Sequence, residues 1–222
     1  MQRKTLLHIV REGWYVLTAL AGLLLLVNAV FGFWAALPVA GLIALAIVFF
    51  RDAPRDVPAE PLAVIAPIDG TIRHRRECYD PYLDREAIKL SIDVNLLGAY
   101  LLRSPAEGTV LELPHETLTK LGTAATWIRT DEGDELIMAV REGSLFGQRP
   151  CRSGYGERVG QGRCCGSRRL ARRVDVFMPM NARVEVELGD RVRAGASVLA
   201  KLVHKQNGRC RSALPVNEPI PE

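Results

Sequence analysis

The side chains suited to metal, redox or acid–base chemistry are few and scattered along this sequence. Four histidines have no metal-ligand spacing among them: His8, His74, His115 and His204. Cys164 and Cys165 adjoin, so the C-x-x-C spacing of zinc and redox motifs is missing, and we predict no metal site. Asp69 is a candidate acid, although an aspartate before a glycine is also an ordinary turn residue. His74 is an alternative base on the same presumed strand and turn.

Charge is unevenly distributed along the chain. The formal net charge is +4. Residues 1–50 are nearly uncharged, residues 51–140 carry an acidic excess and residues 141–175 an arginine excess. The basic excess is therefore local, and it does not predict binding to nucleic acid. Within it, the segment 142–170 is rich in Gly, Arg and Cys, and its pattern is irregular. Either it is a loop that faces anionic lipid, or it is a stretch translated in a shifted frame.

The first fifty residues predict a membrane anchor. No charged side chain occurs from Gly13 to Phe50, a run about twice as long as the roughly 20 residues of one spanning helix. We predict helices over Trp14–Ala29 and Phe33–Phe50, joined by a very short loop. Basic residues flank both outer ends, which favours a cytoplasmic location for these ends. A cleaved signal peptide and one long re-entrant helix are the alternatives.

After Arg51 the pattern changes to short apolar runs separated by turn residues, which indicates β-structure. The candidate strands are Ala63–Ala66, Ala87–Val94, Thr109–Leu113, Ala124–Arg129, Leu136–Val140, Val174–Met178, Arg183–Leu188 and Ser197–Leu202. Glycine turns between them are typical of barrel-sandwich domains. We predict a mainly β, barrel-sandwich-like soluble domain preceded by an N-terminal transmembrane helical hairpin. The expected parts are a two-helix anchor (1–50), a β-rich domain (51–205) and a C-terminal tail (206–222).

Six short phrases follow one another along the chain in a characteristic order. They are FRDAPRDVP at 50–58, APIDG at 66–70, LLRSPAEG at 101–108, GERVGQGRCCG at 156–166, RVDVFMP at 173–179 and GDRVRAG at 189–195. Together with the hydrophobic hairpin, this ordered set resembles the short bacterial, pyruvoyl-dependent form of the phosphatidylserine decarboxylase family. The resemblance extends over nearly all of residues 1–205.

The resemblance implies a carbon–carbon lyase that converts phosphatidylserine to phosphatidylethanolamine, a step of phospholipid biosynthesis. Its partners would be the phospholipid substrate and the bacterial inner membrane, with the soluble domain on the cytoplasmic side. In the family, a serine hydroxyl attacks the preceding glycyl carbonyl, the chain is cut, and the new N-terminus becomes a pyruvoyl group that draws in electrons. Carried onto this zymogen, Ser167 is the pyruvoyl precursor and Gly166 supplies the cleaved carbonyl. Asp69 would assist proton movement, and Arg103 or Arg173 would hold the lipid phosphate.

The sequence departs from the family pattern near the serine and at a histidine. Aligning the strand after the serine directly puts Ala171 and Arg172 where Gly-Ser belongs, whereas Gly166-Ser167 lies five residues earlier. Either the loop is longer here and Ser167 is the nucleophile, or Ser167 is incidental. The family histidine falls on Tyr100, and a tyrosine is a poor base at neutral pH.

Two other classes of protein stay open at this stage. One is a catalytically inactive, membrane-anchored family member that binds lipid or protein. The other is a transporter accessory protein whose β domain lies outside the cell. The sequence leaves both a monomer and a homo-oligomer open.

Overall fold

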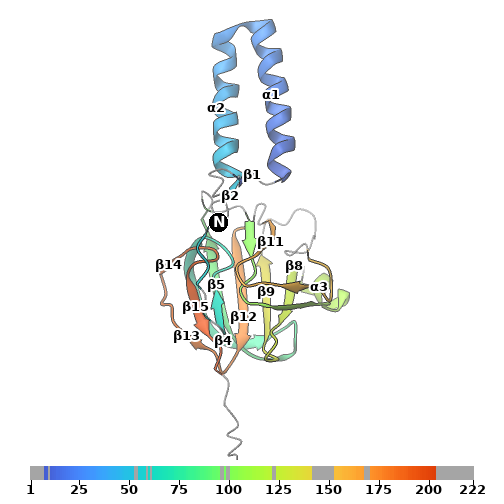
Figure 1. The fold of residues 1–222 in the computed structure, drawn as a ribbon, viewed down its shortest axis with the longest axis vertical. Coiled ribbons are helices and arrows are strands. Elements are labelled where there is room, and N and C mark those ends of the chain that lie inside the picture. Colours follow the sequence, from blue (N-terminus) through green and yellow to red (C-terminus); the bar gives the residue numbers. More distant parts are fainter. Residues whose placement is uncertain are drawn as a thin grey trace, which may run out of the picture.

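A helical hairpin stands on one end of a β domain in this protein (Figure 1). The structure is a computed structural model that describes residues 8–9, 11–52, 55–58, 60, 62–95, 98, 101–121, 124–141, 153–167 and 171–203. The predicted tail at 206–222 lies outside these residues, as do parts of the arginine-rich segment.

The hairpin consists of α1 (Arg11–Phe31) and α2 (Phe33–Phe49), with Gly32 as the only residue between them. Gly32 has a φ of +80°, which glycine adopts without strain. At 1.5 Å per residue the helices are about 32 Å and 26 Å long, close to the thickness of a bilayer's hydrocarbon core. The stretch Gly13–Phe31 is apolar and long enough to cross a membrane, whereas α2 is shorter. The predicted N-terminal helical hairpin is confirmed.

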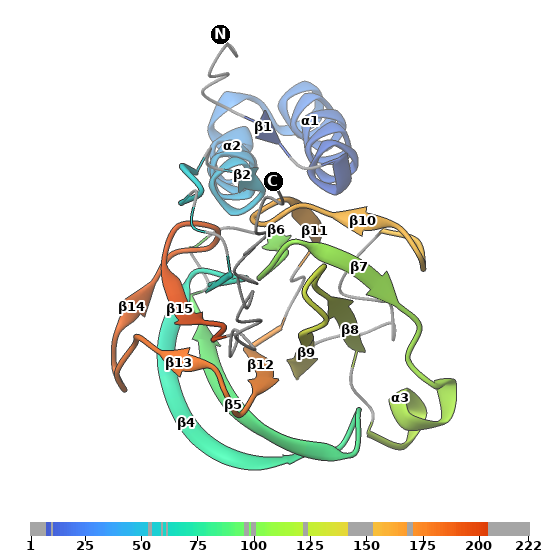
Figure 2. The ribbon, with the colours of Figure 1, turned by 60° about the horizontal axis from the view of Figure 1, so that its bottom comes forward.

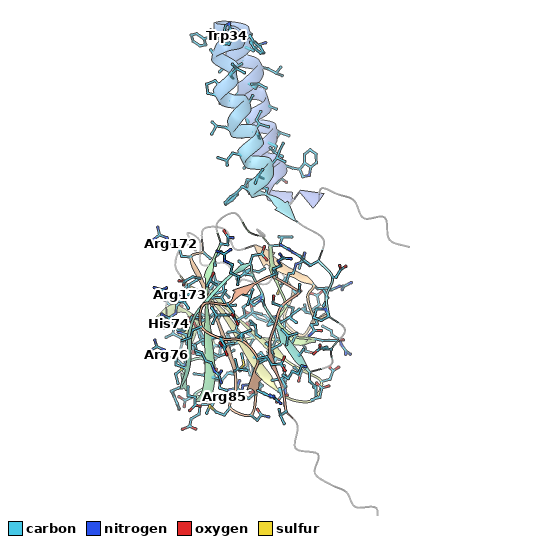
Figure 3. The ribbon with its side chains drawn as sticks, turned by 90° about the vertical axis from the view of Figure 1, so that its left-hand side faces the viewer. Trp34, His74, Arg76, Arg85, Arg172 and Arg173 are labelled. Carbon is cyan, nitrogen blue, oxygen red and sulfur yellow. The ribbon has the colours of Figure 1, made fainter. Side chains whose placement is uncertain are left out.

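The outer surface of the hairpin is apolar, and a short pair of strands joins the segments before α1 and after α2 at its open end. Trp34, at the loop end, is 82% exposed (Figure 3). Since such a surface is unfavourable in water, it is compatible with insertion into lipid. The two-residue strands β1 (His8–Ile9) and β2 (Arg51–Asp52) pair antiparallel at the other end, so that the chain leaves the hairpin next to the β domain.

An eight-stranded antiparallel sheet forms most of the β domain. Its strands, in spatial order, are β10 (Arg158–Val159), β7 (Gly108–Leu111), β8 (Ala124–Arg129), β9 (Glu135–Arg141), β12 (Arg173–Pro179), β5 (Arg85–Val94), β4 (Gly70–Asp80) and β14 (Arg191–Val192). Figure 2 shows the two long strands β4 and β5 curving around the domain. The sheet does not close into a barrel.

Two smaller sheets complete the domain. One contains β6 (Leu101–Arg103) and β11 (Cys164–Ser167). The other contains β13 (Arg183–Val184), β15 (Val198–Lys201) and β3 (Ala63–Ile65). Their apolar side chains and those of one face of the large sheet form the main core, which includes Leu90, Leu102 and Val176. A smaller cluster on the other face of the large sheet packs partly under α3 (His115–Leu121).

The mainly β fold class is confirmed, and all eight candidate strands contain a strand, although one is much shorter than expected. The candidate at 183–188 is reduced to the two residues of β13. The long strand β4, presumed only around His74, and the short strands β6, β10, β11 and β14 were not among the candidate strands. Of these, β10 and β11 lie inside the arginine-rich segment, so its described part is ordered into paired strands.

Candidate functional site

The Asp69 carboxylate is the best-connected candidate site group. It is 8% exposed, and its two oxygens have separate partners. Oδ2 accepts a hydrogen bond from Nη2 of Arg55 at 2.8 Å, and Oδ1 accepts one from the backbone N–H of Ala194 at 2.7 Å. The Asp69 carbonyl accepts a further bond from the N–H of Asn95 at 2.9 Å. Asp69 therefore joins the linker after the hairpin, the turn before β4, the end of β5 and the last glycine turn.

A glycine packs directly against this carboxylate. A Cβ atom at Gly98 would lie 2.6 Å from the Cβ of Asp69 and 3.1 Å from its Oδ2. Real Cβ atoms do not approach so closely, so any larger residue at 98 would displace the Asp69 turn. The segment after β5 is thus fitted closely to the candidate acid.

Asp69 and His74 line one open groove of about 990 Å³ between β4 and β14. Its walls are rich in arginine: Arg55, Arg73, Arg191 and Arg193. Figure 3 shows His74 and Arg173 on the same side of the domain, with Arg172 nearer to the hairpin. The sequence-predicted acid and the alternative base therefore share a solvent-accessible site. No group of three or more metal-ligating side chains gathers among the described residues.

The Gly166–Ser167 bond lies in β11, which runs antiparallel to β6. Cys164 pairs with Arg103, Gly166 with Leu102 and Ser167 with Leu101, and the register shifts between Cys164 and Gly166. Such a bulge bends the strand and often accompanies an active site. In Figure 1, β11 lies at the end of the β domain that is next to the hairpin. The candidate cleavage bond is therefore on the hairpin side of the domain.

Hydrogen bonds connect this bond to the Asp69 turn through β6. The N–H of Arg103, which follows the partner of Gly166, donates to the carbonyl of Pro67 at 2.9 Å. Pro67 lies two residues before Asp69 in the same turn. The Asp69 turn and the Gly166–Ser167 strand, which are about 100 residues apart in the sequence, therefore both contact β6.

The two arginines suggested for the lipid phosphate have different surroundings. Arg103 is buried, and its Nη1 donates to the carbonyl of Gly162 at 3.0 Å. It therefore holds the loop that precedes β11. Arg173 is half-exposed, and its Nε donates to Oδ1 of Asp93 at 2.9 Å. Because Asp93 lines the groove, only Arg173 lies beside it.

Ala171 and Arg172, the residues that a direct alignment with the family pattern puts at the Gly-Ser position, also lie near this groove. The Arg172 carbonyl accepts a hydrogen bond from the N–H of Val94 at 2.9 Å, and Val94 lines the groove. Ala171 is buried and the Arg172 side chain is exposed. Tyr100, at the position of the family histidine, lies outside the described residues.

The four arginines that line the groove had no predicted role at the site: Arg55, Arg73, Arg191 and Arg193. The alternation in the phrase GDRVRAG could have pointed to Arg191 and Arg193, since residues two apart on a strand face the same side. No comparable pattern marks Arg55, whose contact with Asp69 arises only from the fold.

Comparison with known proteins identifies relatives along almost the whole chain. A phosphatidylserine decarboxylase proenzyme of Cupriavidus taiwanensis is 35% identical over 206 residues, which cover 87% of this chain and 95% of the relative. One of Burkholderia vietnamiensis is 34% identical over 206 residues, with 87% and 96% covered. No protein-family model matches. Glucose permease IIA from Mycoplasma capricolum aligns with a TM-score of 0.44 at 19% identity, covering 65% of this chain and 97% of that structure.

Proposed function

Since this chain belongs to the phosphatidylserine decarboxylase family, we propose that it is a proenzyme that cuts itself at the Gly166–Ser167 bond and then decarboxylates phosphatidylserine to phosphatidylethanolamine. The observation that carries this proposal is the path from Gly166 through β6 to the Asp69 turn. It supports Ser167 as the nucleophile, because the strand that contains it pairs with β6, and β6 is hydrogen-bonded to the Asp69 turn.

The proposed cleavage conserves atoms at each step. The Ser167 hydroxyl oxygen attacks the Gly166 carbonyl carbon, the peptide nitrogen leaves, and an ester forms. Loss of the Ser167 Cα proton then expels the Gly166 carboxylate. One water molecule replaces ammonia at the new N-terminus and produces the pyruvoyl carbonyl. When present, that carbonyl supplies the electron sink that carbon dioxide loss requires.

The residues of this chain would have separate tasks in the reaction. Asp69 lies in a groove open to solvent and would assist proton movement there. The Arg103 side chain would hold the loop before β11 through its bond to Gly162, so that the Gly166 carbonyl keeps its position for attack by the Ser167 hydroxyl. Burial of Gly166 would limit competing hydrolysis of the ester.

The cytoplasmic location of the β domain is also part of this proposal. Both ends of the hairpin are on the same side as the domain, and basic residues flank them: Arg3, Lys4, Arg11, Arg51 and Arg55. A membrane-impermeant maleimide applied to intact spheroplasts should leave Cys78 unlabelled, and lysis should expose it. Labelling of Cys78 before lysis would contradict a cytoplasmic domain.

Denaturing electrophoresis and intact mass of the purified full chain test self-cleavage. We expect two fragments from the unaltered protein, the smaller one beginning at residue 167 without a free N-terminal amine. The Ser167→Ala variant should remain one chain of 24.5 kDa. Ser144→Ala, which alters the other Gly-Ser pair, is the matched control and should still be cut. An uncut unaltered chain, or a cut Ser167→Ala chain, would contradict the proposal.

A further inference from the structure

A row of polar residues crosses four neighbouring strands beside the groove. Arg173 on β12 is opposite Asp93 on β5, Asp93 is opposite Thr71 on β4, and Thr71 is opposite Arg191 on β14. Residues directly opposite in an antiparallel pair have their side chains on the same face of the sheet. The neighbouring positions Ile72 and Val192 belong to the core. The row therefore lies on the solvent-facing side of the sheet.

Positive charge in this groove exceeds the negative charge available to neutralise it. Two of the described carboxylates line it, Asp69 and Asp93, and both have arginine partners. Asp69 binds Arg55 at 2.8 Å, and Asp93 binds Arg173 at 2.9 Å, with Arg73 at a looser 3.8 Å. Asp69 and Asp93 are therefore both paired with arginines other than Arg191 and Arg193.

Arg191 and Arg193 are thus the uncompensated cations of the groove. Both side chains are exposed, and neither has an ion-pair partner among the residues that the structure describes. They are two residues apart on and just after β14, and both line the same cavity wall. Two guanidinium groups in this arrangement suit the oxygens of a phosphate, which accept paired N–H donors.

The size and position of the groove favour a lipid headgroup over a small ion. Its volume of about 990 Å³ is far larger than one phosphate needs. Arg55, which lines the groove, follows the end of α2 at Phe49 by six residues, so this part of the groove would lie near the membrane surface once the hairpin is inserted. A phosphodiester held in the bilayer could therefore reach the groove without leaving the membrane interface.

We propose that the groove between β4 and β14 binds the phosphodiester of a phospholipid headgroup, and that Arg191 and Arg193 are its phosphate-binding residues. This inference rests on the proposed function, since it assigns residues that bind the phosphate of the phospholipid substrate. It differs from the sequence-based expectation, in which Arg103 or Arg173 holds the phosphate. In the structure these two side chains are bound to Gly162 and Asp93.

Binding can be measured separately from self-cleavage and decarboxylation. The probe is glycerophosphoglycerol, a soluble headgroup phosphodiester that has no amine and so cannot react with a pyruvoyl carbonyl. It is titrated by calorimetry into the full chain in a neutral detergent, alongside inorganic phosphate. The test variant is Arg191→Gln/Arg193→Gln. The charge-matched control is Arg75→Gln/Arg76→Gln, which removes two exposed arginines of β4 that do not line this groove.

We expect the test variant to bind glycerophosphoglycerol at least about tenfold more weakly, because two charge-assisted contacts are lost, while the control binds as the unaltered chain does. Equal binding by the test variant, or no binding by the unaltered chain, would overturn the proposal. Binding of inorganic phosphate but not of the phosphodiester would also overturn it, since the groove would then take a free ion. Self-cleavage of the unaltered chain is measured in parallel. If this chain cuts itself but does not bind the probe, the present inference fails and the proposed function stands. If it binds the probe but does not cut itself, the proposed function fails and the present inference stands.

Discussion

Asp69 and Asp175 are both buried carboxylates that bind basic side chains, but they lie in different surroundings. Asp175, in the middle of β12, is fully buried and binds Lys89 at 2.9 Å, Arg141 at 3.0 Å and the Ser91 hydroxyl at 2.6 Å. All of these partners are on the two strands that flank β12, and Asp175 is not among the residues that line the groove beside Asp69. Asp69 binds a linker and a turn beside an open groove.

This difference separates a structural charge from one that is available for chemistry. A carboxylate enclosed by strands can only hold these strands together, since no substrate atom can reach it. A carboxylate that is largely buried but stands at a groove wall can contact a bound molecule. Burial and ion pairing alone therefore do not identify a site. The cavity next to the group does.

The largest effect on folding is expected from Asp175→Ala. Removing the carboxylate leaves Lys89 and Arg141 close to each other without a counter-charge, at a cost of about 3 kcal/mol. For a chain of this size we expect the Tm of the full chain in detergent to fall by roughly 10 °C. Thermal unfolding followed by circular dichroism measures this shift.

The matched control for Asp175 is Asp131→Ala, which removes an exposed carboxylate that binds Arg158. Exposed ion pairs contribute little, so the Tm of this variant should change by at most about 2 °C. If the two variants lose the same stability, the network around Asp175 does not hold β12 in the sheet.

Asp69→Asn should have a small effect on stability and a large effect on self-cleavage, the opposite of what we expect for Asp175→Ala. The amide oxygen can still accept the bond from Ala194, so we expect a smaller loss of stability than for Asp175→Ala. Self-cleavage should slow by about 100-fold or more, because the charged group beside the groove is gone. The rate of fragment appearance on denaturing gels, measured together with Tm, distinguishes the two carboxylates. Cleavage at the normal rate in Asp69→Asn would remove Asp69 from the chemistry.

Sequence patterns predicted the parts of the fold that bury continuous apolar runs. Strands β5 and β12 contain alternating or clustered apolar residues, mostly Ile, Val and Leu. Both strands were found near their expected bounds. In β4 most residues from Arg73 to Tyr79 are charged and exposed, so the strand has no apolar face to detect. Its order comes from pairing with β5, a long-range effect that local propensity does not contain.

The candidate site was predictable only in part, for a related reason. Asp69 is detectable because it stands in a characteristic turn phrase. The partners of its side chain lie 14 and 125 residues away, and no spacing rule connects residues at such separations. The family resemblance identified the right phrases, but it could not show that Arg191 and Arg193 lie in the same groove as Asp69.

Gly98→Ala tests whether the position of the Asp69 carboxylate matters as well as its charge. The new Cβ would lie 2.6 Å from the Cβ of Asp69, so the turn must move. We expect a cost of about 1–3 kcal/mol, as for other overpacked sites, and slower self-cleavage. The control is Gly154→Ala, where the nearest atom to a new Cβ is 3.8 Å away. Equal cleavage rates in the two variants would mean that the Asp69 turn tolerates displacement.

The smallest effect on stability is expected at Asp80. This third carboxylate is buried but has no close ion pair within the described part of the chain, so it shows what burial does without close ion pairing. It is fully buried, accepts a bond from the N–H of Tyr82 at 2.9 Å, and has Arg85 only at 3.9 Å. Burial raises the pKa of Asp80 above its ordinary value of 3.8, against the lowering effects of the Tyr82 N–H and of Arg85. Between the unfolded and folded pKa the folded state binds more protons, so this group contributes stability at low pH that is lost as pH rises through the folded pKa.

Asp80→Asn should remove this contribution while keeping an acceptor for Tyr82. The Tm of the variant, minus that of the unaltered chain, should therefore increase as pH rises from about 3.8, and then stay constant above the folded pKa. Glu132→Gln, at an exposed turn position, is the control and should give a difference without this slope. A difference that falls with rising pH would mean that Asp80 is stabilised as a carboxylate by Arg85, and that it resembles Asp69 and Asp175 more than its 3.9 Å separation from Arg85 indicates.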